Sequence, residues 1–250
     1  MRKTALNSGN LSDGNMKGAV MEKIKNDMGK TALFLKIGII GACIILAGDM
    51  LMGWGIKDMN AVGIEREISQ YLALSDKRML LAAIFGFTGV PLAVVGHFGI
   101  YRLIKPYSPE YSKMYALGNI GFLAFGGAGV HVSSVEAAFF YKYMNATGSV
   151  TALESAMKFV SCFLVPLYIV VLISWFIMVY AHIRAVLKGL TPFSLKILIF
   201  SMPVGILLTG IIGIFGNYEI VNALMVGAFS IGNIWTLAGH LFMVNKLNKK

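Results

Sequence analysis

A histidine, two serines and a glutamate lie together in GVHVSSVE, Gly129–Glu136, inside a segment that is otherwise apolar enough to span a membrane. Ionisable side chains are costly in hydrocarbon, so they indicate candidate sites. His131 is the central residue because imidazole binds or releases a proton near neutral pH. Ser134 lies three residues further on and shares the helix face of His131. Glu136 is five residues from His131, about 140° round the helix, and therefore points in another direction.

Asp49 is the second candidate, and it lies late in the first apolar segment. An isolated carboxylate in a membrane costs at least about 2.5–3.5 kcal/mol, so Asp49 needs a partner, a proton or access to water. His131 is the natural partner, because imidazole can donate a hydrogen bond to the carboxylate or share its charge. We therefore predict one ligand-binding layer made of Asp49, His131, Ser134 and Glu136, with three further polar residues at a similar height: Asn217, Glu219 and Asn222.

A second polar layer is predicted nearer the opposite end of the helices, made of His97, Asn119, Asn233 and His240. A lone histidine or asparagine in a membrane helix usually bonds a neighbouring helix, for about 0.6–2 kcal/mol, which favours a structural role. His182 is expected at the headgroup boundary. Because no HExxH-type spacing occurs, the sequence predicts no metal site and no cofactor.

Composition assigns the chain to the polytopic membrane proteins. Of its 250 residues, 57% are hydrophobic and 14% are charged, whereas soluble domains carry about 25% charged residues. The net charge is +10, but the basic residues lie between apolar segments, which is a topology signal and not a nucleic-acid site. We therefore expect an all-α helical bundle whose partners include membrane lipids, with no nucleic acid.

Six apolar segments approach or exceed the roughly 20 residues that a spanning helix needs. They cover residues 32–54, 79–104, 114–141, 157–186, 194–216 and 220–245. We predict one six-helix transmembrane domain over residues 32–246, preceded by a basic cytoplasmic tail, residues 1–31. An external amphipathic helix is expected near residues 60–74, where apolar residues recur at helical spacing.

The distribution of lysine and arginine predicts the orientation. One side of the predicted membrane domain carries 16 of these residues and the other side carries 6. The positive side is cytoplasmic, so both termini are predicted to be inside the cell. The layer with Asp49 and His131 then lies in the outer half of the membrane.

Two stretches resemble six-span bacterial integral membrane protein families of unknown function. They are LAGDMLMGWG, Leu46–Gly55, and GGAGVHVSSVEAAFF, Gly126–Phe140. The resemblance implies a bacterial plasma membrane and carries no assigned activity.

Three functions stay open on the residues. The first is transport or binding of a small polar or cationic ligand, coupled or not to protons, in an outward-facing cavity with the external helix as a lid. The second is an intramembrane hydrolase for a lipid, with His131 as base, Asp49 orienting it or binding a metal, Ser134 as nucleophile and Glu136 as acid. The third is a structural or partner protein, which predicts no cavity larger than a few waters.

Overall fold

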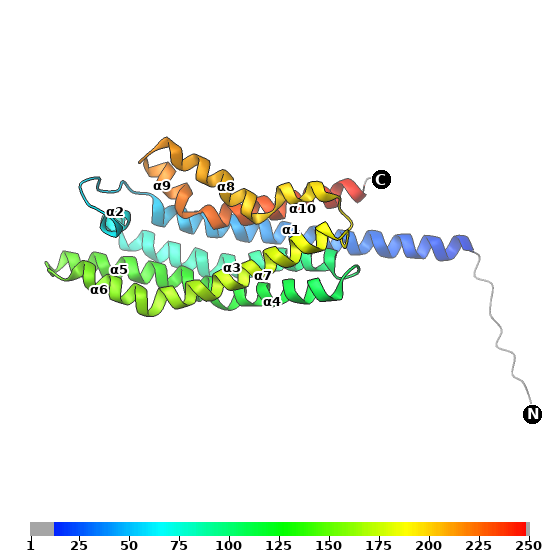
Figure 1. Cartoon of the computed structure of the whole chain (residues 1–250), viewed down its shortest axis with the longest axis horizontal. Coiled ribbons are helices and arrows are strands. Elements are labelled where there is room, and N and C mark those ends of the chain that lie inside the picture. The colour runs from blue at the N-terminus through cyan, green and yellow to red at the C-terminus, as the bar shows by residue number, and fades with distance from the viewer. Residues whose placement is uncertain (1–12, 249–250) are drawn as a thin grey trace, which may run out of the picture.

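The computed structural model describes the backbone of residues 13–248 and the side chains of residues 27–248. Every regular element in that range is helical, which confirms the all-α class. The long helices lie side by side along one axis, and α1 projects beyond the bundle (Figure 1). The elements, with π- and 3₁₀-segments marked η, are α1 (Asp13–Gly53), α2 (Ile64–Ser69), η1 (Gln70–Ala73), α3 (Asp76–Ile104), α4 (Pro109–Phe125), η2 (Gly126–His131), α5 (Val132–Ala146), α6 (Ala152–Phe159), η3 (Val160–Leu164), α7 (Val165–Leu187), η4 (Leu195–Phe200), α8 (Met202–Ile212), η5 (Gly213–Phe215), α9 (Glu219–Val226) and α10 (Ala228–Asn248).

Four helices in the described part of the chain are long and apolar enough to cross a membrane, and they match the first four predicted segments. They cover Asp27–Gly53, Asp76–Ile104, Pro109–Ala146 and Ala152–Leu187. A fifth crossing is formed if α9 and α10 count as one span, although they are bent by 65°. These helices indicate an integral membrane protein. Of the predicted tail, residues 1–12 lie outside the described residues, and residues 13–31 form the start of α1.

The continuous helix expected over residues 194–216 is not formed. The chain makes the 3₁₀ segment η4, turns at Ser201 in an extended conformation, and only then begins α8. Pro203 lies in the first turn of α8 and not inside a longer helix. A proline is favourable there because its missing N–H has no helical partner anyway. The resulting apolar helix, Met202–Phe215, is shorter than the other spans.

Helices α1 and α3 approach to backbone contact through glycines. A Cβ atom on Gly38 would overlap the Cα of Gly96, and a Cβ on Gly89 would lie 2.8 Å from the carbonyl oxygen of Gly41. Small residues at such crossings let membrane helices pack closely. Because α1 carries Asp49, this contact also fixes the position of that carboxylate.

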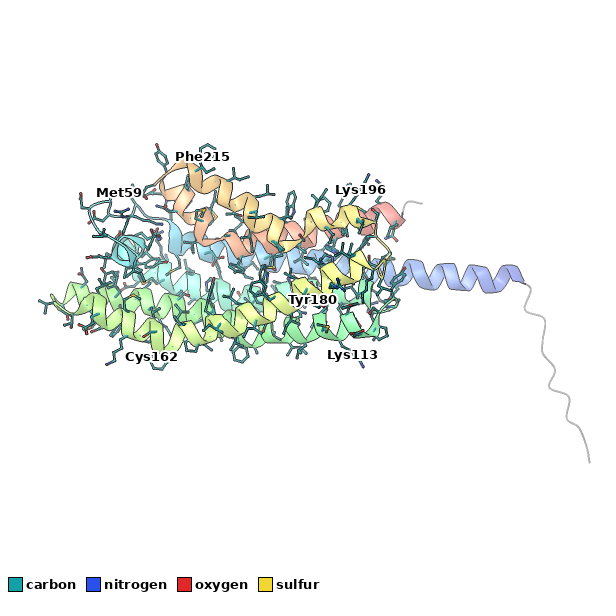
Figure 2. The ribbon with its side chains drawn as sticks, in the orientation of Figure 1. Met59, Lys113, Cys162, Tyr180, Lys196 and Phe215 are labelled. Atoms are coloured by element: carbon teal, nitrogen blue, oxygen red, sulfur yellow. The ribbon has the colours of Figure 1, made fainter. Side chains whose placement is uncertain are left out.

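The helix α6–α7 contributes the most exposed surface among the four long spans. Ile169, Ile173 and Phe176 are each more than half exposed. Cys162 and Tyr180, labelled in Figure 2, are exposed as well. Apolar side chains at this exposure are expected on a helix that faces lipid.

Polar contacts close the end of the bundle near α2, which we call the α2 end. The Arg78 guanidinium donates to the carbonyls of Leu51 and Trp54, both at 2.7 Å. The Asn222 amide donates to the Gly55 carbonyl at 2.7 Å, and Asn217 donates to the Lys57 carbonyl at 3.0 Å. The Trp54 indole donates to Glu219 at 2.9 Å. Asn217, Glu219 and Asn222 therefore hold the α1–α2 connection and do not line the cavity described below.

Candidate functional site

Asp49 and His131 meet between α1 and the α4–α5 helix. The Asp49 Oδ1 atom lies 3.3 Å from His131 Nδ1, and the two side chains are 15% and 11% exposed. The second carboxylate oxygen accepts a 2.5 Å hydrogen bond from the Ser230 hydroxyl on α10. The other imidazole nitrogen, Nε2, donates to the Ala82 carbonyl on α3 at 2.9 Å. Ser230 of α10 and His131 of η2 thus contact the carboxylate, and Ala82 of α3 contacts the imidazole.

Glycines make room for the imidazole. A Cβ on Gly86 of α3 would overlap the His131 ring, and a Cβ on Gly48 of α1 would lie 3.3 Å from Nε2. His131 also ends the π-helical segment η2. A π-turn inserts one extra residue into the helix and changes the direction of the side chains that follow it. The GGAG run therefore positions the histidine in addition to allowing close packing.

A helix break lies directly beside the carboxylate. Helices α9 and α10 bend at Gly227, and a Cβ at that position would lie 3.6 Å from the Asp49 Cβ. Ser230 is in the first turn of α10, so the amino-terminal end of this helix lies near Asp49. The positive end of a helix dipole stabilises a nearby negative charge. The break therefore supplies both a hydroxyl donor and a favourable field to Asp49.

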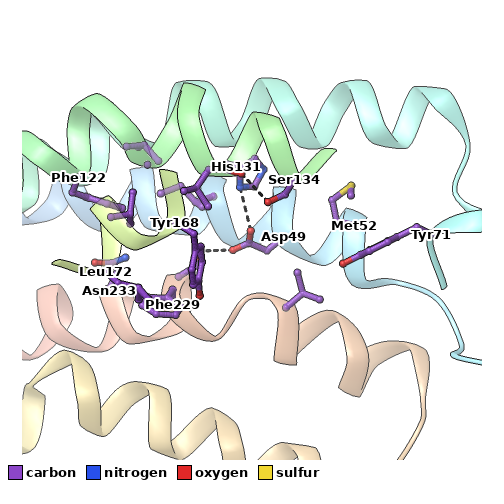
Figure 3. Close-up of a pocket in the computed structure, with 17 residues that line it drawn as sticks. Asp49, Met52, Tyr71, Phe122, His131, Ser134, Tyr168, Leu172, Phe229 and Asn233 are labelled. Atoms are coloured by element: carbon purple, nitrogen blue, oxygen red, sulfur yellow. Dashed lines mark hydrogen bonds and ion pairs between the residues drawn. The ribbon is translucent and has the colours of Figure 1, made fainter. Parts of the chain in front are cut away.

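The pair forms one wall of a cavity of about 230 Å³. Figure 3 shows the labelled side chains of Phe122, Leu172 and Phe229 around the same space. Among the described residues, Asp49 and His131 are the only acidic and basic side chains in its lining, which is otherwise mainly apolar. A buried water needs only about 10–15 Å³ of such space. The cavity is therefore large enough for an organic molecule.

Tyr71 lines the cavity at the α2 end. It belongs to η1 and lines both this cavity and a second one, of about 190 Å³, beneath α2. Its hydroxyl points toward the Asp49 side of the cavity (Figure 3). Burial is the main cause that raises the pKa of Tyr71 above its usual value. Tyr71 is therefore a neutral hydrogen-bonding group near pH 7.

Ser134 and Glu136 have different positions relative to this cavity. Ser134 lines it, but its hydroxyl donates to the Val130 carbonyl of its own helix at 2.7 Å. Glu136 is exposed and lines a separate hollow beside Phe139 and Phe159. Of the four residues in the first predicted layer, three reach the cavity and Glu136 does not.

The second predicted layer is buried, and two of its members bond each other. His97 Nε2 and Asn233 Oδ1 are 2.8 Å apart, and His97 Nδ1 lies 2.8 Å from the Tyr115 hydroxyl. Asn119 donates separately to the Val94 carbonyl at 3.1 Å. Asn233 also lines the large cavity, so it links the two layers.

His240 and His182 form a further buried pair. His240 Nδ1 donates to the Thr236 carbonyl at 2.7 Å, and the two Nε2 atoms are 3.1 Å apart. His182 was expected at the headgroup boundary, and the structure shows its side chain inside the bundle, only 5% exposed. It faces His240 of α10, with ring centroids 4.8 Å apart. Among the described residues, no cluster of three or more potential metal ligands is present.

We expect His97→Leu to destabilise the protein. The substitution removes both hydrogen bonds and leaves the Tyr115 hydroxyl and the Asn233 carbonyl unpaired in a buried place, at about 1–3 kcal/mol each. Thermal unfolding in detergent measures the loss. Thr88→Val, at an exposed position of the same helix, is the control and should change the stability by less than about 0.5 kcal/mol. Equal unfolding temperatures for the two variants would contradict a structural role for His97.

The chain matches one family model over residues 21–247, almost the whole of the described part. It belongs to the family of unknown function DUF6796. No curated protein and no solved structure matched it. The family thus supplies no activity, and the chemistry of the site has to be argued from its geometry.

Several residues around the cavity and the polar layers of this DUF6796 protein were not identified from the sequence. Ser230 is the most important, since it is the direct donor to Asp49. It lies three residues before Asn233 on the same face of α10, which was the available signal. Tyr71, Tyr168 and Tyr115 gave no such signal, because tyrosines are common in membrane helices and at their ends.

Proposed function

We propose that this protein binds a small polar or cationic ligand in the cavity beside Asp49 and His131 and transports it across the membrane. The observation that carries the proposal is a cavity of about 230 Å³ with one acidic and one basic side chain from the described part of the chain, Asp49 and His131, in contact at its wall. Apolar cavities with a few convergent polar groups are the usual form of small-ligand sites. A broken helix beside the site is also typical of transporters.

The proposal includes an orientation. The excess of lysine and arginine on the side of the chain termini supports a cytoplasmic location of both termini. The α2 end then faces outward, and η1, which directly follows α2, covers the cavity on that side through Tyr71. Tyr71, which lines the cavity from η1, is the contact through which this cover would meet a ligand.

The geometry gives less support to the hydrolase. Both imidazole nitrogens of His131 are engaged, one by Ala82 and one by Asp49, and the Ser134 hydroxyl donates to a backbone carbonyl. A serine nucleophile needs a hydrogen bond to its base. A purely structural role predicts no cavity beyond a few waters, and the cavity volume argues against it.

The test is a thermal-shift screen of small polar and cationic compounds at pH 5–8, followed by uptake of any hit into proteoliposomes. A compound at 100 times its Kd stabilises the protein by about 2.7 kcal/mol. We expect this stabilisation in the wild type and a strong loss in Asp49→Asn and in His131→Ala. Glu136→Gln, outside the cavity, is the matched control and should respond like the wild type. Hits that stabilise all four proteins equally, or a screen without hits, would contradict the proposal.

A further inference from the structure

The contacts of His131 determine how many protons the Asp49–His131 pair holds. Since a carbonyl oxygen can only accept, His131 Nε2 donates its proton to Ala82. In a neutral ring the second nitrogen, Nδ1, then carries no proton, and it faces Asp49 Oδ1 at 3.3 Å. A neutral ring beside an ionised carboxylate would set two acceptors against each other. One shared proton removes this repulsion, and the pair with that proton has no net charge.

Other titratable groups near the pair do not compensate an added charge. Tyr71 on η1 and Tyr168 on α7 line the cavity as neutral phenols, and no lysine or arginine with a described side chain does. Three charged residues on the packed helices are engaged or directed elsewhere: Arg78 on α3 bonds backbone carbonyls, Glu219 on α9 bonds the Trp54 indole, and Glu136 on α5 is exposed in another hollow. A cation that entered without loss of the proton would leave a net positive charge in an apolar cavity, which is unfavourable.

The mouth of the cavity is on the side of the bundle. The lining residues with the largest exposure are Tyr168 on α7, 40% exposed, and Val226 on α9, 37% exposed. Helix α7 packs along α4, and α10 packs along α1 and α8. Across the mouth, the Phe229 ring contacts Tyr168 and Trp175, with centroids 6.5 and 5.6 Å apart. Tyr168 belongs to a helix long and apolar enough to cross a membrane, and Val226 and Phe229 belong to a bent helix pair that passes the same test together. An opening between such helices would face lipid.

We propose that the cavity takes an amphipathic organic monocation, with an apolar body and one ammonium group, from the bilayer in exchange for the shared proton. The ammonium group occupies the place beside Asp49 Oδ1 and His131 Nδ1. The shared proton leaves to solvent, so one proton is released for each cation bound. The net charge of the site is therefore unchanged. No covalent bond to carbon forms or breaks. The aromatic rings at the mouth suit a cation, since their faces attract positive charge. This inference rests on the proposed function and specifies its ligand class.

Benzyltrimethylammonium is a suitable probe because its charge does not titrate. Its Kd is measured by calorimetry with the full-length protein in nanodiscs at pH 6, 7 and 8, in two buffers that differ in ionisation enthalpy. We expect release of about one proton per cation. The Kd should therefore fall by up to tenfold for each unit by which the pH rises, as long as the free pair holds its proton. Neopentylbenzene, the neutral isostere, should bind at least about tenfold more weakly and without pH dependence.

Two variants complete the test. Asp49→Asn should weaken binding of the probe by at least about tenfold and abolish proton release. Glu136→Gln should bind like the wild type. A Kd of the wild type that is independent of pH, equal binding of neopentylbenzene, or no binding of the cation would each overturn the inference. If another compound from the screen still binds and depends on Asp49, the proposed function stands and only this ligand class is wrong.

Discussion

Gly86→Ala is expected to expel the His131 ring from its place between α1 and α3 and so to separate it from Asp49. The added Cβ would overlap the imidazole, and its three nearest neighbours are all atoms of that ring. The ring would lose its bond to Ala82, and Asp49 would lose its partner. Breaking a buried charge pair by removing one partner costs about 3–5 kcal/mol. We expect a loss near the lower figure, since both groups are partly exposed.

A double-mutant cycle with His131→Ala separates this cause from a general packing effect. Without the imidazole the new methyl group has room, so Gly86→Ala should be neutral or stabilising in that background, because alanine favours helix over glycine by about 1 kcal/mol. Gly210→Ala, on α8, is the control, since a Cβ there has no neighbour within 4 Å. The free energy of unfolding in detergent is measured for each variant. An equal loss from Gly86→Ala with and without His131 would contradict the explanation.

Gly38→Ala is expected to have a comparably large effect, because it forces α1 away from α3. The new Cβ would overlap the Cα of Gly96 and lie 3.1 Å from a Leu237 methyl on α10. No side-chain rotation relieves a contact with backbone, so the helices themselves must move. Overpacking of this kind costs about 3 kcal/mol. Because Asp49 is on α1, ligand response should fall with the stability.

Gly29→Ala is the matched control for this second prediction. It lies on the same helix, and a Cβ there has no neighbour within 4 Å. Alanine should therefore leave the stability unchanged or raise it by up to about 1 kcal/mol. Unfolding temperatures of the two variants, measured in the same detergent, test whether the α1–α3 contact causes the loss of stability. Similar temperatures would show that the α1–α3 contact tolerates a wider spacing than the glycines indicate.

Helix location was largely predictable, and helix continuity was not. Long apolar runs must form helices in a membrane because every backbone N–H and C=O needs an internal partner, so the first four segments were located correctly. The same reasoning failed for residues 194–216, where hydropathy is high but Ser201 is extended and α8 starts afresh. Hydropathy averages over a window and does not report where Pro203 begins a helix instead of bending one.

The height of a residue along a helix is also a weak guide to what its side chain contacts. Asp49 and Glu219 were assigned similar heights, yet Asp49 faces a cavity and Glu219 bonds the Trp54 indole near α2. His182 was expected at the boundary and is buried against His240. Height follows from counting residues, whereas direction depends on the rotation of each helix, which packing sets.

By itself, the sequence determined that this protein is an all-helical chain suited to a membrane, and it singled out Asp49 and His131, because the cost of an ionisable group in hydrocarbon can be judged from local composition alone. Only the tertiary structure decided that the two residues lie 3.3 Å apart, that Ser230 is the donor to the carboxylate, and that Glu136 is outside the cavity. The physical reason is that these contacts depend on a π-turn at η2, a bend at Gly227 and glycine contacts between α1 and α3. Each of these features rotates or shifts a helix by an amount that residue spacing does not encode.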